Sequence, residues 1–182
     1  MMNIIIFEDK STSDLKPFTY NHASFEVKTG MYSNLDRFVS IFSEYRIYLI
    51  VREEIEEIIS EKYSFLKVNP KEIPEGYCIN GKVIWKEEYN KLLNKNLKSD
   101  NFLFYNKENR ISRDNFYLND IFSEKQKNKN SLKNIQYLWD AIDFFEDKIN
   151  EDFNLLKSKV KNKFNSSSHF VNKSKIVINK TA

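Results

Sequence analysis

Two carboxylates follow the first apolar run of the chain. Ile4–Phe7 is a short run of large apolar residues, and Glu8 and Asp9 come directly after it. Such a run, bounded by polar residues, predicts a strand buried on both faces of a parallel sheet. Ligands of these sheets bind beyond the carboxyl ends of the strands, where Glu8 or Asp9 could hold a divalent metal or a sugar hydroxyl. The alternative is a solvent-facing turn.

The polar loop after this strand, which ends at Gly30, carries three further candidates. Lys16 and Lys28 could neutralise phosphate oxygens as point charges, although isolated lysines are usually surface residues. His22 is one of only 2 histidines and could donate to a phosphate or transfer a proton. Because no metal-ligand spacing surrounds His22, the alternative is a hydrogen-bonded loop histidine.

A second polar group follows a later strand. Asn80, Gly81 and Lys82 come directly after the strand predicted at Tyr77–Ile79. Since the carboxyl ends of parallel strands meet at one edge of the sheet, we expect this group at the same edge as Asp9. Gly81 would let a ligand approach the backbone, although a plain turn explains these residues equally well.

Trp139 and Asp140 lie in a helix predicted at Ser131–Ile149. We expect Trp139 to anchor the core and Asp140 to be able to face the pocket. The helix prediction rests on apolar residues at helical spacing. These residues are Leu138, Ala141, Ile142, Phe145 and Ile149.

Composition and missing motifs exclude several function classes. A chain of 182 residues suits one domain, or one domain with a small appendage. A net charge of +3 is too mild to indicate nucleic-acid binding. The basic run Lys125–Lys133 is interpreted as a solvated loop, with phosphate or RNA binding as the alternatives. The sequence has no Gly-rich phosphate loop, no GxSxG motif and no paired metal-binding histidines.

The sequence also predicts the compartment. The single Cys78 excludes an internal disulfide and fits a reducing compartment. The first residues do not have the pattern of a signal peptide, and no long apolar span occurs in the chain. We therefore expect a soluble, cytoplasmic protein with no membrane partner.

Predicted strands and helices alternate along the first half of the chain. This order predicts right-handed parallel crossovers, and hence an α/β fold with a mostly parallel central sheet flanked by helices. The predicted strands are Ile4–Phe7, Arg46–Val51, Leu66–Val68, Tyr77–Ile79 and Phe102–Tyr105, the last with Arg110 and Ile111 as a hairpin partner. The predicted helices are Ser33–Ser43, Glu53–Tyr63, Glu87–Leu97 and Ser131–Ile149, of which the first carries a capping box from Ser33 to Asp36.

The tail changes character, because Ser and Asn dominate it. Val171 and Val177 are six residues apart, which is the spacing of a left-handed parallel β-helix. Such a solenoid needs about three repeats, and a terminal strand pair is the alternative. We predict an α/β domain at residues 1–164 and the truncated beginning of a β-helix, a short stub, at residues 165–182.

Four segments resemble motifs of the GlmU-like sugar nucleotidyltransferase family. Leu15–Thr19 is similar to LrPLT, Phe25–Met31 to aELRvGi and Ile79–Lys82 to iNGr. Leu138–Ile142, with Asp152 after it, is similar to the family's pWdi segment and its trailing aspartate. The resemblance runs over nearly the whole chain, with the segments in the family's order.

The resemblance implies a Rossmann-like domain of the nucleotide-diphospho-sugar-transferase type. It implies formation of a nucleotide sugar and pyrophosphate from an NTP and a sugar 1-phosphate, with Mg²⁺ as the cofactor. A homotrimer is expected if the β-helix continues. The roles expected of individual residues are catalytic for Lys16, His22 and Lys28, substrate-binding for Asn21, Asn80, Gly81 and Lys82, and metal-binding for Asp9 and Asp140.

The first loop departs from the wider superfamily at its charged positions. Asp9–Asp14 lacks the glycines and the arginine of the triphosphate loop, and Ala23 and Ser24 occupy the Pro-Lys positions. His22 stands where the GlmU-like relatives usually have Arg. Phosphoryl-type transfer depends on positioning and charge neutralisation, so His22 and the two loop lysines would supply the positive charge. The alternative function is a catalytically inactive scaffold, or a sugar-nucleotide binding platform for a downstream β-helix acyltransferase.

Overall fold

A five-stranded sheet with the order β3-β2-β1-β5-β6 forms the centre of the molecule. The computed structural model describes residues 2–94, 97, 99–107, 111–112, 130–159, 167 and 169–176, and of these the side chains of 111–112, 155–159 and 174 are not described. The strands are β1 (Asn3–Phe7), β2 (Arg46–Ile50), β3 (Lys67–Val68), β4 (Glu72–Ile73), β5 (Gly76–Asn80), β6 (Leu103–Asn106) and β7 (Ile111–Ser112). The α-helices are α1 (Asn34–Ile41), α2 (Glu56–Lys62), α4 (Asp140–Asp143) and α5 (Phe145–Lys159). The 3₁₀ helices span Lys10–Leu15, Phe18–Tyr20, Ser24–Glu26, Glu53–Ile55, Glu87–Leu92 and Lys173–Lys175.

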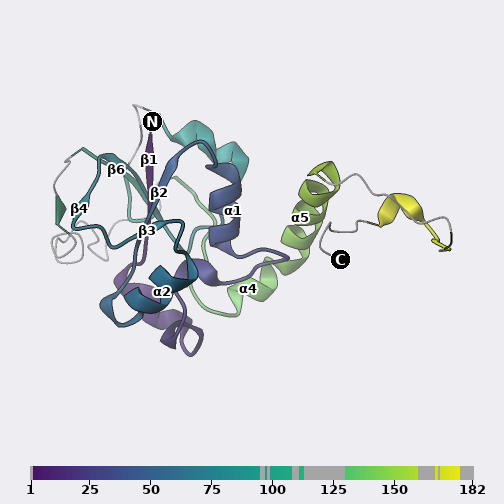
Figure 1. Ribbon diagram of the computed structural model, residues 1–182, viewed down its shortest axis with the longest axis horizontal. Coiled ribbons are helices and arrows are strands. Elements are labelled where there is room, and N and C mark those ends of the chain that lie inside the picture. Colours follow the sequence, from purple (N-terminus) through teal and green to yellow (C-terminus); the bar gives the residue numbers. More distant parts are fainter. Residues whose placement is uncertain are drawn as a thin grey trace.

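The first strand is the centre of the sheet. β1 pairs in parallel with β2 on one side and with β5 on the other, and β2 pairs in parallel with β3. Figure 1 shows α1 between this sheet and α5. The prediction of an α/β fold with a mostly parallel sheet and flanking helices is thereby confirmed, with β6 as an antiparallel strand beside β5.

Both faces of β1 are apolar because each face packs into a separate core. Ile4 and Ile6 belong to the cluster that includes Phe38 of α1, whereas Ile5 and Phe7 belong to a cluster on the other face. Successive side chains of a strand point to opposite faces. A strand covered on both sides therefore needs a continuous apolar run, and Ile4–Phe7 supplies it.

Helix α1 begins where the sequence predicts it. The Ser33 side chain accepts a hydrogen bond from the backbone N–H of Asp36, and the Asp36 carboxylate accepts one from the backbone N–H of Ser33. This capping box satisfies two donors that would otherwise be unpaired at the helix start. Phe38 and Phe42 then stack on each other, and both rings pack at a tilt against Trp85.

The late helical region begins later than predicted, at Asp140 rather than Ser131, and it ends at Lys159 rather than Ile149. The segment before it forms an extended bridge, in which Ile84 N–H donates to the carbonyl of Lys133 at 2.9 Å and Ile135 N–H donates to that of Lys82 at 2.9 Å. Burial of Leu132 and Ile135 in this bridge outweighs the helical pattern, so the helical part begins only at α4. Trp139 is 61% exposed, and its predicted role as a core anchor is therefore wrong.

Two other local predictions were also wrong. Ile111 lies in β7 and pairs antiparallel with Ile73 of β4, not with the strand predicted at Phe102–Tyr105. The helix predicted at Glu87–Leu97 is a 3₁₀ helix that ends at Leu92. The strand error arises because a two-residue strand carries no periodicity of its own, so its pairing with the distant β4 decides its place.

Some predictions fall outside the described residues. These are Arg110, most of the basic run Lys125–Lys133, and Val177, one of the two valines on which the β-helix prediction rests. The β-helix stub and the division at residues 164 and 165 therefore stay predictions. Within the described part of the chain, no helix has the length and apolar character to cross a membrane.

Candidate functional site

Four side chains from two strand ends meet at the carboxyl edge of the sheet. Asp9, which follows β1, accepts hydrogen bonds at Oδ1 from Ser11 N–H at 3.0 Å and from Ser11 Oγ at 2.6 Å. Asn80, the last residue of β5, donates from Nδ2 to Asp9 Oδ2 at 2.7 Å. The backbone N–H of Lys82 donates to Asn80 Oδ1 at 3.0 Å. Asp9, Ser11, Asn80 and Lys82 are called the strand-end cluster below.

A buried ammonium group is the main charge of the strand-end cluster. Lys82 Nζ donates to Ser11 Oγ and lies 3.4 Å from Asp9 Oδ1. The side chain of Lys82 is 4% exposed and that of Asp9 is 15% exposed. An ammonium group at this depth interacts more strongly with charges than one in water, because solvent screens it less. The cluster thus pairs one cation with one anion at the end of two parallel strands.

A second ion pair fixes the loop beside the cluster. Both carboxylate oxygens of Glu8 lie 3.0 Å from Arg52 Nη1, and Oε1 accepts from Ser24 N–H at 2.7 Å. Arg52 Nη2 donates to the carbonyls of Thr19 and His22. Burial raises the pKa of Glu8, and the charge of Arg52 opposes that rise. The hydrogen bonds of the Glu8 carboxylate therefore fix the loop in place, and this carboxylate is not free to bind a metal or a sugar.

The end of the loop is joined to α5 by a buried ion pair. Arg37 of α1 bonds both carboxylate oxygens of Asp152, with Nε at 3.2 Å and Nη2 at 2.6 Å. The backbone N–H of Met31 also donates to Asp152 Oδ2, at 2.9 Å. A Cβ at Gly30 would lie 2.7 Å from that same oxygen. A glycine is therefore needed here because the carboxylate approaches the backbone closely.

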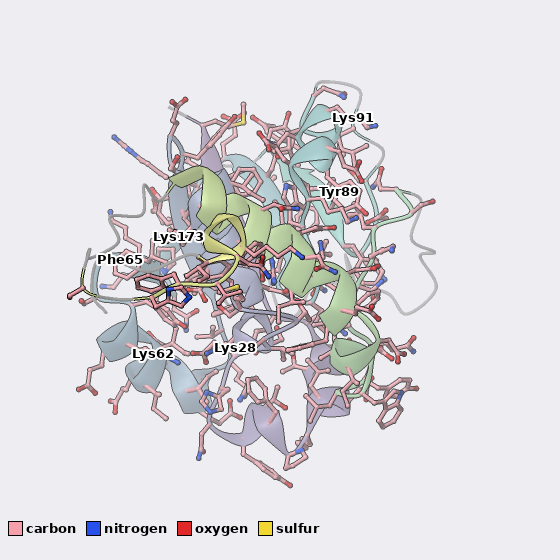
Figure 2. The ribbon with its side chains drawn as sticks, turned by 90° about the vertical axis from the view of Figure 1, so that its right-hand side faces the viewer. Lys28, Lys62, Phe65, Tyr89, Lys91 and Lys173 are labelled. Carbon is pink, nitrogen blue, oxygen red and sulfur yellow. The ribbon has the colours of Figure 1, made fainter. Side chains whose placement is uncertain are left out.

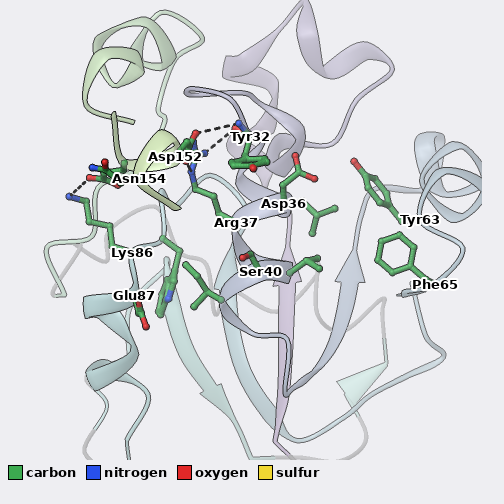
Figure 3. A pocket seen from close by; sticks show the side chains of 15 residues that line it. Tyr32, Asp36, Arg37, Ser40, Tyr63, Phe65, Lys86, Glu87, Asp152 and Asn154 are labelled. Atoms are coloured by element: carbon green, nitrogen blue, oxygen red, sulfur yellow. Dashed lines mark hydrogen bonds and ion pairs between the residues drawn. The ribbon is translucent and has the colours of Figure 1, made fainter. Parts of the chain in front are cut away.

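A pocket of about 850 Å³ lies along α1, between the chain after α2 and helix α5. Figure 3 shows Tyr63 and Phe65 on one side of this pocket and Lys86 and Asn154 on the other. Carboxylates outnumber cations among its charged lining residues, which are Asp36, Glu87, Glu151, Asp152, Arg37 and Lys86. None of the strand-end cluster lines it. An acidic lining repels a triphosphate, so phosphate chemistry is better placed at the strand-end cluster.

The sequence was compared with models of known protein families. The family model described as sugar nucleotidyl transferase matches residues 4–161. The chain belongs to this family. Among curated proteins, none matches the chain. The matched region begins in β1 and ends just after α5, so it includes both the strand-end cluster and the Arg37–Asp152 pair.

The structure brings some of the predicted site residues of this transferase family together. Asp9, Asn80 and Lys82 share the strand-end cluster, as their position after neighbouring strands predicts. Gly81 lies between them and donates its N–H to the carbonyl of Phe7 at 2.8 Å. A nucleotidyltransferase needs positive charge and hydrogen-bond donors at one place, and this edge of the sheet has both.

Three loop residues that were predicted to act in catalysis or substrate binding are not part of the strand-end cluster. Lys16 is exposed, and its ammonium lies 5.4 Å from the centre of the Tyr20 ring. Lys28 and Asn21 are exposed as well. Within the described part of the chain, no hydrogen bond or ion pair joins these three residues to the strand-end cluster. Their roles toward phosphate and substrate stay predictions.

His22 is held on two sides. Its ring stacks on Phe18 with the centroids 4.6 Å apart, and Nδ1 lies 3.5 Å from Glu26 Oε2. Glu26 is itself buried and accepts hydrogen bonds from Ala23 N–H and the Tyr63 hydroxyl. The ring contact with Phe18 and the carboxylate beside Nδ1 together fix the orientation of the His22 ring.

The two predicted metal ligands have different surroundings. Asp140 Oδ2 accepts from the backbone N–H of Gln136 at 2.7 Å and of Tyr137 at 2.8 Å, so it stabilises the turn before α4. Asp9 Oδ2 has Asn80 as its hydrogen-bond donor. Across the residues that the structure describes, no group of three or more His, Cys, Asp or Glu side chains could hold a metal. Mg²⁺ needs only one or two carboxylates when phosphates supply other ligands, and Asp9 fits that requirement.

Three residues of this region were missed by the sequence analysis. Ser11 was overlooked because a serine in a polar loop carries no pattern. Arg52 and Arg37 had a detectable signal, since arginine is the preferred partner of a buried carboxylate. Arg52 comes two residues after the end of β2, and Arg37 lies on α1.

Proposed function

We propose that this protein transfers a nucleotidyl group from an NTP to a sugar 1-phosphate at the strand-end cluster. The family match supports nucleotidyl transfer. The observation that carries the location is the buried Lys82 ammonium group, which lies beside Ser11 and Asp9 where two parallel strands end. Ligands of parallel sheets bind at this edge.

The proposed reaction is a displacement at the α-phosphorus of the NTP. A phosphate oxygen of the sugar 1-phosphate attacks the α-phosphorus of the NTP and forms a new P–O bond. The bond from the α-phosphorus to the bridging oxygen breaks, and pyrophosphate leaves with that electron pair. Negative charge gathers on the oxygens around the phosphorus, so positive groups fixed in advance lower the barrier.

Different residues of this chain would neutralise phosphate charge and contact the substrates. Lys82 would neutralise phosphate charge from within the cluster, and Asn80 and Gly81 would lie against the nucleotide or sugar. Lys16, Lys28 and His22 would supply further positive charge from the loop, and Asn21 would contact substrate there. These loop residues are exposed or half-exposed, which leaves them accessible to a charged ligand.

Asp9 is the residue that would hold Mg²⁺. When bound, the metal would neutralise the phosphate oxygens and orient the triphosphate. Asp9 keeps its position through Ser11 and Asn80. A role for Asp140 in metal binding remains part of the proposal, although two backbone N–H groups already bond its carboxylate.

A pyrophosphate-release assay tests the proposal. Purified protein is incubated with Mg²⁺, each of the common NTPs and a panel of sugar 1-phosphates. We expect pyrophosphate release that depends on both substrates and yields a nucleotide sugar detectable by mass spectrometry. Absence of pyrophosphate with every pair would contradict the proposed activity.

A catalytically inactive platform is the second candidate, because one specific observation favours it. Lys82 and Asp9 already neutralise each other, and the loop Asp9–Asp14 has no glycine or arginine to cradle a triphosphate. Calorimetric titration with nucleotide sugars separates the two candidates. Binding without turnover supports a binding platform, and absence of both binding and turnover supports a structural scaffold.

A further inference from the structure

Two aromatic side chains lie at the surface in the turn before α4. Trp139 is 61% exposed and Tyr137 is 38% exposed. Their rings stack on each other, with the centroids 4.7 Å apart and the planes 14° from parallel. Because Tyr137 covers only one face of the Trp139 ring, the exposed area of Trp139 comes mainly from its other face and its edges. We call Tyr137 and Trp139 the aromatic pair.

The turn that carries the aromatic pair is fixed at both ends. The Asp140 carboxylate accepts hydrogen bonds from the backbone N–H groups of Gln136 and Tyr137, and the backbone N–H of Asp140 donates to the carbonyl of Tyr137 at 3.1 Å. Ile135 before the turn and Ala141 after it are both buried. A surface that is held in place before a ligand binds loses little conformational freedom on binding. The turn therefore presents the two rings in a fixed position.

The aromatic pair is close to the strand-end cluster. Ile135 N–H donates to the carbonyl of Lys82 at 2.9 Å, and Lys82 supplies the ammonium group of the cluster. Ile135 also shares an apolar cluster with Leu15, which ends the 3₁₀ helix that contains Ser11. Trp139 follows Ile135 by four residues, and four residues of chain span at most about 14 Å. In Figure 1, α4 lies toward the end of the molecule at which β1 finishes, away from the N-terminus.

We propose that the aromatic pair stacks on the nucleobase of the NTP while the strand-end cluster binds the phosphates. For the identity of the ligand, this inference rests on the proposed function. A nucleobase is flat and aromatic, so it can continue the parallel stack of Tyr137 and Trp139. A sugar ring is neither flat nor aromatic, which favours the base over the sugar as the group that binds here. Stacking tolerates every base, so the pair contributes affinity without selecting one base.

Calorimetric titration with NTPs tests the contribution of stacking to affinity. We expect Trp139→Ala to raise the dissociation constant about 5- to 100-fold, as the loss of one base-stacking contact does, and Trp139→Phe to stay within about threefold of wild type. Phe65→Ala is the matched control, because Phe65 is an aromatic side chain that is 70% exposed. Figure 2 shows Phe65 at the left of the view and the green ribbon of α4 at the lower right. This control should bind NTPs like wild type.

A ligand without a base separates the aromatic pair from the strand-end cluster. Inorganic triphosphate should bind wild type and Trp139→Ala equally, because it has no ring to stack. If Trp139→Ala weakens NTP and triphosphate binding alike, or weakens neither, the role of the aromatic pair is overturned even where pyrophosphate release is found. If the loss is confined to NTPs but no substrate pair releases pyrophosphate, the base site is supported and the proposed transfer is contradicted. Absence of NTP binding to wild type overturns both.

Tryptophan fluorescence tests the same contact directly. The chain has 2 tryptophans, and Trp85 is 1% exposed, so quenching by a stacked base would come mainly from Trp139. We expect NTPs to quench the emission of wild type but not of Trp139→Phe, and inorganic triphosphate and glucose 1-phosphate to leave it unchanged. Quenching by glucose 1-phosphate alone would assign the pair to a sugar and overturn the proposal. Emission that shifts with protein concentration alone would assign the pair to a contact between copies and would also overturn it.

Discussion

Glu8 shows how a single buried residue couples the loop to pH. Its carboxylate is 2% exposed and is held by Arg52 and by Ser24 N–H. Burial raises its pKa above the ordinary value of 4.5, and Arg52 offsets this only in part. The folded state therefore binds a proton at Glu8 more readily than the unfolded chain does. By linkage, the stability contributed by Glu8 is present below pH 4.5 and falls as pH rises through the raised pKa.

We predict that Glu8→Gln removes this pH dependence. The free energy of unfolding is measured by urea titration of wild type and variant, from below pH 4.5 to neutrality. Relative to Glu8→Gln, wild type should lose stability as the pH rises. A relative gain for wild type would mean that Arg52 lowers the pKa of Glu8 in the folded state and would contradict the prediction.

Gly30 lies where a side chain would collide with the ion pair of Arg37 and Asp152. A Cβ at this position would lie 2.7 Å from Asp152 Oδ2 and 3.1 Å from Arg37 Nη2. We predict that Gly30→Ala lowers the free energy of unfolding by about 1–3 kcal/mol, because the ion pair must move to make room. Urea unfolding measures the change. Lys28→Ala, an exposed neighbour on the same loop, is the control and should change little.

At the level of elements, α1 and α5 are joined through one buried ion pair. Arg37 is 6% exposed and Asp152 is 1% exposed, so removal of either partner leaves a buried charge uncompensated. We predict that Arg37→Met or Asp152→Leu alone lowers the free energy of unfolding by about 3–5 kcal/mol. The double variant should cost clearly less than the sum of the two, as measured by a double-mutant cycle. Additive losses would show that the pair does not act as a unit.

The elements also show where sequence reasoning works. The apolar run of β1 and the capping box of α1 depend on neighbouring residues, so the pattern alone predicts them. The bridge of Leu132 and Ile135 to the chain after β5 depends on a distant partner. The exposed Ile142, Phe145 and Ile149 of α4 and α5 have the same helical spacing as a buried stripe. Spacing shows which residues share a side of a helix and does not show what covers that side.

For the whole molecule, the parallel orientation of the first strands could be predicted from the sequence. Alternating strands and helices indicate that β1, β2 and β3 are parallel, and they are. Polar residues after β1 and β5 could then be placed at one edge, and Asp9, Asn80 and Lys82 do meet there. The closure of the cluster by Ser11 could not be predicted, because it depends on the fold of the 3₁₀ helix Lys10–Leu15.

The rate of pyrophosphate release by Lys82→Met tests the central claim, that the strand-end cluster is the catalytic site, most directly. Loss of the buried ammonium should lower kcat/KM by about 100-fold or more, whereas Lys91→Met, an exposed lysine on the 3₁₀ helix Glu87–Leu92, should leave it unchanged. Circular dichroism and the urea midpoint confirm that both variants are folded. A folded Lys82→Met variant that releases pyrophosphate at the wild-type rate would contradict the claim.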